Sequence, residues 1–186
     1  MAGRTPTEAF VEFIAPIQQA LGLLTAGRLL LAGNSRGLRV GQPEKVIFND
    51  GDPINLRSSL AGSIFLELTL RVETIHLPHG PDPYDCRLVG YWYALSTSAS
   101  REILAFHWTP DMIGNQRSFP HLHVGTVVSS EGGVAPDRFH KLHMPTGHVP
   151  VPALVRFAIQ EFGVSVRPSV ETEAAIHQLD RLEQPG

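Results

Sequence analysis

The chain has 186 residues, of which 42% are hydrophobic and 18% are charged, and its formal net charge is −3. This length supports one domain with a substantial core, so we expect a single domain over residues 1–186. The slight acidity argues against a broadly basic surface for binding nucleic acid, but it leaves open a small site that acts on RNA.

Cysteine usage and hydropathy exclude further classes of protein. Cys86 is the only cysteine, which excludes an intramolecular disulfide and a multi-cysteine zinc site. The first residues lack the cationic and then apolar pattern of a signal peptide. The most apolar window, residues 21–32, is too short to span a bilayer and contains Arg28. We therefore expect a cytoplasmic protein that does not enter a membrane.

Residues 1–31 are predicted to be an N-terminal helical segment. The Thr-Pro-Thr-Glu run at residues 5–8 fits an N-cap, a proline at the first helical position and a capping box. Apolar residues then recur at helical spacing over residues 10–24 and form one face. Pro16 is expected to kink this helix or to divide it into two short ones.

Residues 45–128 are predicted to form a curled antiparallel sheet of about four to five strands. The clearest strand covers residues 64–72, where apolar and polar side chains alternate with a period of two. Residues 151–182 are expected to form helices, the first of which ends at a Gly163 cap. These elements predict an α+β fold in which N-terminal and C-terminal helices pack on the sheet. The other predicted strands lie at residues 45–49, 86–95, 102–108 and 121–128.

The strongest chemical signal is a concentration of histidines. Six of the nine histidines fall between Phe106 and His148. Histidine exchanges protons near neutral pH and is a common metal ligand. A single histidine beside aromatic residues is often only a packed structural residue, but six within this short stretch indicate a functional cluster.

Strand geometry selects the centre of this cluster. Residues two apart in a strand point to the same face, so His121 and His123 are expected to project together. His107 lies on the preceding predicted strand, and all three imidazoles converge if the two strands are neighbours. The sequence order suggests this adjacency but does not establish it.

A histidine-rich segment at residues 139–148 supplies further candidates. Lys141 could hold a phosphate or stabilise developing negative charge, and His143 is a plausible neighbour of the site. His140 and His148 are weaker candidates. A structural role is the better interpretation for the outlying histidines at positions 76, 79 and 177.

Three chemical templates can be compared with this pattern. A nucleotide hydrolase with three alternating histidines needs a histidine at position 125, which is Gly125. A cupin-type metal motif needs a glutamate soon after the H-x-H pair, whereas the next acidic residue is Glu131. A metal-independent ribonuclease centre needs only a base, an acid and a cation, which the histidines and Lys141 supply.

The order of these motifs resembles that of a known group of proteins. An aromatic strand containing Tyr91-Trp92-Tyr93 precedes the strand Ile103-Leu104-Ala105-Phe106-His107-Trp108, the segment Phe119-Pro120-His121-Leu122-His123 and a helix. Over about residues 84–163 this resembles uncharacterised bacterial proteins and, more distantly, the TumE family of toxin–antitoxin toxins. The resemblance implies a bacterial toxin-like protein with an antitoxin partner, and it implies that His107, His121 and His123 are site residues.

Two functions are therefore carried forward. In the first, the protein cleaves RNA by general acid–base catalysis without a cofactor, using His107, His121, His123, Lys141 and His143. In the second, it is a metal-binding or small-ligand-binding module in which His121 and His123 bind a divalent metal such as zinc. A homodimer fits either function. A third interpretation is a partner-binding domain whose N-terminal helix is the contact surface.

Overall fold

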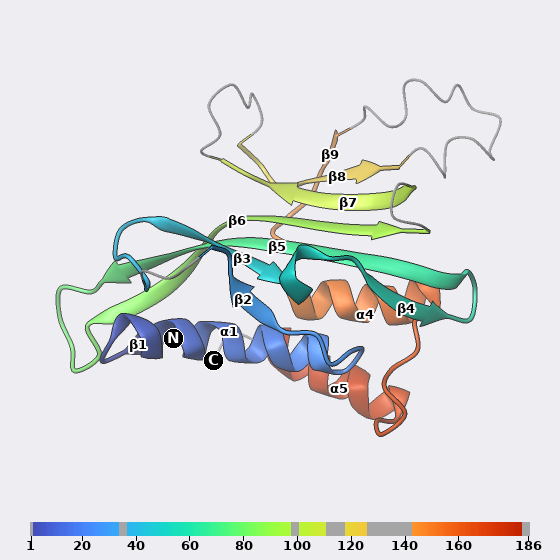
Figure 1. Ribbon diagram of the computed structural model, residues 1–186, viewed down its shortest axis with the longest axis horizontal. Coiled ribbons are helices and arrows are strands. Elements are labelled where there is room, and N and C mark those ends of the chain that lie inside the picture. Colours follow the sequence, from blue (N-terminus) through green and yellow to red (C-terminus); the bar gives the residue numbers. More distant parts are fainter. Residues whose placement is uncertain (1, 34–36, 98–100, 111–117, 126–142, 184–186) are drawn as a thin grey trace.

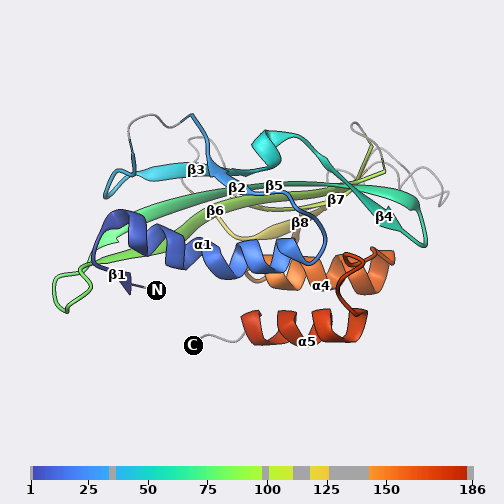
Figure 2. The same ribbon diagram turned by 60° about the horizontal axis from the view of Figure 1, so that its bottom comes forward.

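The fold is α+β, as predicted, and its helices lie on one face of a large antiparallel sheet (Figure 1). Helices α1 (Pro6–Gly22) and α4 (Val151–Phe162) run along this face, and α5 (Thr172–Glu183) lies on their far side (Figure 2). This computed structural model describes residues 2–33, 37–97, 101–110, 118–125 and 143–183.

The sheet has nine strands within the described residues, and every pairing between them is antiparallel. Its main order is β2-β3-β5-β6-β7-β8-β9, while β1 pairs with β6 and β4 pairs with β5. The sheet does not close into a barrel, and β2 and β9 lie at its two ends. The strands are β1 (Ala2–Gly3), β2 (Leu29–Leu31), β3 (Pro43–Phe48), β4 (Ile54–Ser58), β5 (Gly62–His76), β6 (Tyr84–Ser96), β7 (Glu102–Trp108), β8 (His121–Val124) and β9 (His143–Pro145).

The prediction of four to five strands was too low. The five predicted strands correspond to β3, β5, β6, β7 and β8, and the end of the last one, residues 126–128, lies outside the described residues. The missed strands β1, β2, β4 and β9 have between two and five residues each. β1, β2 and β9, with two or three residues, are too short to show a period of two. β4 does alternate between buried and exposed residues, and the prediction overlooked it.

Helix α1 begins as predicted, with the Thr5 hydroxyl oxygen accepting a hydrogen bond of 3.1 Å from the Glu8 backbone N–H. Pro16 was expected to kink or to divide this helix, and the division is wrong, because one helix continues through Pro16 to Gly22. The predicted helical segment 1–31 was also too long, since its last three residues form β2. A short 3-10 turn, η1 (Asn49–Gly51), separates β3 from β4.

Gln18 joins α1 to the outer edge of the sheet beside β2. Its side-chain amide donates a hydrogen bond to the Gly27 carbonyl and accepts one from the Leu29 backbone N–H, each 2.9 Å long. These are the groups that a neighbouring strand would pair with, and exposed strand edges invite pairing with other chains. The Gln18 amide therefore covers part of an otherwise open edge.

The core lies between the sheet and the helices α1 and α4. Alternate residues of β5 are buried, and they meet a buried stripe on α4 and the buried end of α1. Burying one such aliphatic side chain contributes roughly 1.5–3 kcal/mol. The central buried side chains are Leu21, Ile64, Leu66, Leu68, Leu70, Val72, Leu154 and Val155.

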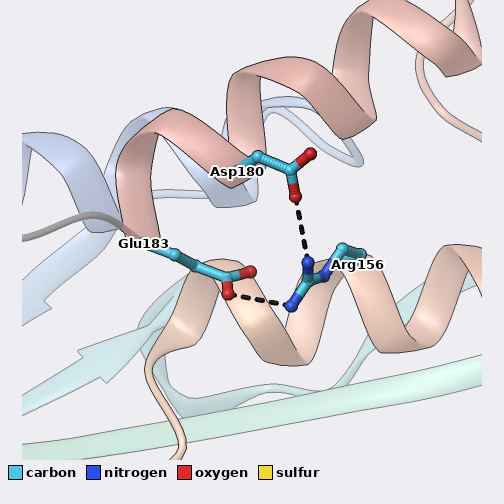
Figure 3. A network of polar contacts seen from close by, with 3 residues as sticks. All are labelled: Arg156, Asp180 and Glu183. Carbon is cyan, nitrogen blue, oxygen red and sulfur yellow. Dashed lines mark hydrogen bonds and ion pairs between the residues drawn. The ribbon is translucent and has the colours of Figure 1, made fainter.

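Helix α5 is attached to α4 by apolar and charged contacts. Gly163 ends α4 in the left-handed conformation (φ 59°), as predicted, and the chain then turns back into α5. Leu179 is fully buried. Arg156 of α4 donates to Asp180 at 2.9 Å and to Glu183 at 2.8 Å (Figure 3). Because these groups are partly exposed, the ion pairs add only modestly to the buried contacts.

Gly125 follows β8 and packs tightly against β7. Its backbone N–H donates a 2.7 Å hydrogen bond to the Ile103 carbonyl. A Cβ atom at this position would overlap the carbonyl oxygen of Glu102. Backbone cannot move aside as the end of a flexible side chain can, so the pairing of β8 with β7 requires glycine here.

We expect Gly125→Ala to lower the free energy of unfolding by about 1–3 kcal/mol, the usual cost of forcing extra atoms into a packed site. Urea unfolding followed by circular dichroism measures this change. Gly147→Ala is the matched control, because a Cβ at Gly147 would have no atom within 4 Å. Equal stabilities of the two variants would contradict the proposed steric role.

Candidate functional site

β7 presents its side chains alternately to the two faces of the sheet. Phe106 meets Phe157 of α4 edge to face, with ring centroids 6.1 Å apart, so it points to the helix-covered face. His107 is the next residue and therefore points to the opposite face. The pairing of β7 with β8 places His107 directly opposite His121. The adjacency that the sequence left open is thus confirmed.

Four imidazole rings meet on this outer face. His123 follows His121 on the same side of β8, and His143 of β9 is directly opposite His123. The ring centroids of His123 lie 4.0 Å from His143 and 4.4 Å from His107. The ring centroid of His121 lies 4.9 Å from that of His123 and 4.8 Å from that of His143. At these separations neighbouring rings are in contact.

His121 is held in one orientation by the backbone. Its side chain is almost completely buried, and its Nδ1 lies 2.9 Å from the Phe119 carbonyl oxygen. A carbonyl oxygen can only accept a hydrogen bond, so Nδ1 must carry the proton. In the neutral ring the other nitrogen, Nε2, then has a free lone pair. This is the form of histidine that binds a metal ion or accepts a proton.

His107 is held in its neutral form. Its pKa is lowered to about 3, chiefly by burial and in addition by repulsion from charge on His123, His121 and His143. Its Nε2 is buried and has no hydrogen-bond partner among the described residues. At neutral pH the ring therefore offers an uncharged nitrogen from inside the cluster.

His107, His121 and His123 can share one metal ion. Each offers a ring nitrogen, and the three nitrogens lie within 4.8 Å of one another. Zinc binds imidazole nitrogen at about 2.0–2.1 Å, which places the ligand atoms of a tetrahedral site about 3.3 Å apart. Rotation of the His107 and His123 side chains would be needed to reach this spacing. The three residues are therefore a candidate site for a small cation with imidazole ligands.

The other sequence candidates are not all part of this cluster. His148 contacts Trp108 edge to face, with centroids 4.2 Å apart, and Trp108 has the same orientation on β7 as Phe106. His148 is therefore separated from the outer-face cluster. Lys141 and His140 lie outside the described residues. His76 pairs with an aromatic ring at the far end of β5.

The sequence missed two features of the site. The metal-binding prediction contained only His121 and His123, whereas the described geometry adds His107. His107 is brought to the site by the register of β7 against β8. This register depends on long-range pairing, which leaves no local signal in the sequence. The second feature is the Phe119 carbonyl, because backbone hydrogen bonds to a side chain leave no pattern in the sequence.

No protein-family model, curated protein or solved structure matches this chain. The resemblance to the TumE toxins therefore stays a prediction from the motifs alone. Within the described residues, no helix combines the length and apolar character needed to cross a bilayer.

We expect the metal-free protein to lose stability as the pH falls from about 6.5 towards 3. The unfolded chain protonates residue 107 at the ordinary histidine pKa of about 6.5, whereas folded His107 stays neutral down to a pKa of about 3. In this window the unfolded state binds more protons, so falling pH favours unfolding. Urea unfolding at a series of pH values, in the presence of EDTA, measures the slope.

The comparison variant is His107→Gln, which keeps a polar side chain and removes the titrating group. Its free energy of unfolding should change less over the same pH window than that of the unmodified protein. Identical pH slopes for the two proteins would show that His107 has no lowered pKa.

Proposed function

We propose that this protein binds a divalent transition metal through His107, His121 and His123, with zinc as the first candidate. The observation that supports this function is the convergence of three imidazole nitrogens from two paired strands. Imidazole is a good ligand for zinc, copper, iron and nickel, whereas magnesium and calcium prefer oxygen. The donor set therefore favours zinc or nickel over magnesium or calcium.

Two features of the rings suit a metal ion. A histidine ligand must be neutral at its binding nitrogen, and the lowered pKa of His107 provides this at neutral pH. At His121 the hydrogen bond from Nδ1 leaves Nε2 as the nitrogen available to a metal. Metal-bound histidines commonly donate their other ring N–H to a carbonyl or carboxylate, which orients the ring. The Phe119 carbonyl occupies that position for His121.

The number of ligands bears on the role of the site. Structural zinc sites are usually closed by four protein ligands, whereas catalytic sites use three and leave one position for water or substrate. His143 contacts the rings of His121 and His123 but is not among the three whose nitrogens converge. We therefore propose a three-histidine site with an open position, which His143 flanks.

RNA cleavage by acid–base catalysis is the alternative function. A base and an acid that act on the two sides of a phosphodiester must leave room for the phosphate between them. The imidazoles of His121, His123 and His143 instead contact one another. Lys141, the predicted phosphate-binding cation, lies outside the described residues. The contacts favour a bound ion over a bound phosphodiester.

We expect the purified protein to contain zinc or nickel in a stoichiometric amount, as measured by elemental analysis after dialysis. His107→Ala, His121→Ala and His123→Ala should each abolish this stoichiometric binding, because each removes one of three ligands. His177→Ala is the control, since His177 is exposed on α5. Metal-free wild-type protein that also fails to take up added zinc would overturn the proposed function.

The variant His143→Ala tests the open position. It should retain stoichiometric metal, because the three converging nitrogens remain in place. A loss of metal as complete as that of His121→Ala would show instead that His143 is a fourth ligand and that the site is closed.

The same proteins distinguish the alternative function. Acid–base catalysis predicts RNA cleavage that persists in EDTA, with an optimum near pH 6–7, and that His121→Ala abolishes. We expect intact RNA after incubation with the metal-free protein, as judged by gel electrophoresis. Cleavage by metal-free wild-type protein, lost in His121→Ala, would favour the ribonuclease.

A further inference from the structure

Residues 118–120 lead into β8, and each of their three carbonyl groups accepts a hydrogen bond from a different donor. The indole Nε1 of Trp108 donates to the Ser118 carbonyl at 3.1 Å. The backbone N–H of Thr146 donates to the Pro120 carbonyl at 2.9 Å. The carbonyl of Phe119, between these two, accepts the hydrogen bond from His121 Nδ1. The Phe119 peptide group is therefore anchored on both sides.

The direction of the Phe119 carbonyl decides which nitrogen of His121 can bind a metal. If this peptide group rotated away, Nδ1 would lose its acceptor and the ring could exchange between its two neutral tautomers. The ring would also lose the hydrogen bond that fixes its orientation. Loss of such outer contacts commonly weakens metal binding by about 10–100-fold.

Trp108 is well placed to hold this segment still. Its indole contacts two other rings, with centroids 6.0 Å from Tyr91 and 4.2 Å from His148. Indole nitrogen is only a donor, so its hydrogen bond to Ser118 has one direction. Trp108 thus links the helix-covered face of β7 to the Ser118 carbonyl, which directly precedes the residue whose carbonyl orients His121 on the other face.

We propose that Trp108 is a positioning residue of the histidine site, acting on His121 through the Ser118 and Phe119 peptide groups. Its effect on metal affinity rests on the proposed metal-binding function. Its effect on the tautomer of His121 does not, because that hydrogen bond is present in the chain without a metal.

The test uses the full chain carrying Trp108→Phe, which keeps an aromatic ring and removes the indole N–H. We expect the zinc Kd, measured by competition with a chelating dye, to rise about 10–100-fold. In the metal-free protein, ¹⁵N chemical shifts of the His121 ring should show a larger share of the Nε2–H tautomer. Replacing Trp108 with benzothienylalanine, which has sulfur in place of N–H, tests the same bond with the ring size kept.

Tyr91→Phe is the matched control. It also removes one hydrogen bond between an aromatic side chain and the backbone, because the Tyr91 hydroxyl accepts from the Val149 N–H at 3.2 Å. It should lower stability while leaving the His121 tautomer and the zinc Kd unchanged. A purely structural role for Trp108 predicts the same result for Trp108→Phe.

The outcomes separate the two proposals. An unchanged His121 tautomer in both Trp108 variants would overturn the positioning role, whatever the metal result. A shifted tautomer in a protein that takes up no zinc would support the positioning role and overturn the metal-binding function. A shifted tautomer together with a raised Kd supports both.

Discussion

The pairing of β7 with β8 is the constraint on which the candidate site depends. These strands are separated by a connection whose central residues lie outside the described chain, yet their register places His107 opposite His121. The period of two then puts His123 on the same face, and β9 adds His143. Helices cover the other face (Figure 2), where the hydrophobic core lies. The histidines can therefore be substituted without removing side chains from this core.

Contact between imidazole rings makes it unfavourable for neighbouring rings to carry a positive charge at the same time. Each proton bound by one ring makes protonation of its neighbours less favourable, and burial adds to this effect at His107. His107 therefore stays neutral at neutral pH, and the lone pair of its ring remains available. Packing places this residue in the chemical state that a metal ion requires, without any nearby carboxylate being needed.

The sequence predicted those parts of the structure that local patterns determine. The alternation in β5, the Thr5 cap of α1 and the Gly163 cap of α4 are local, and all three were confirmed. The short strands β2, β4 and β9 exist through their pairing with a neighbouring strand, and they were missed. The candidate site divides in the same way, since the H-x-H pair is a local pattern, whereas convergence with His107 depends on register.

The tight packing of Gly125 against β7 bears on which face of the sheet carries the histidines. Sliding β8 by one residue along β7 would turn His121 and His123 towards the helices and bring Leu122 out to the opposite face. Gly125 lies against the Glu102 carbonyl in the observed alignment, where no larger residue fits. Gly125 thereby helps to determine whether the histidines form a site on the outer face or point into the core.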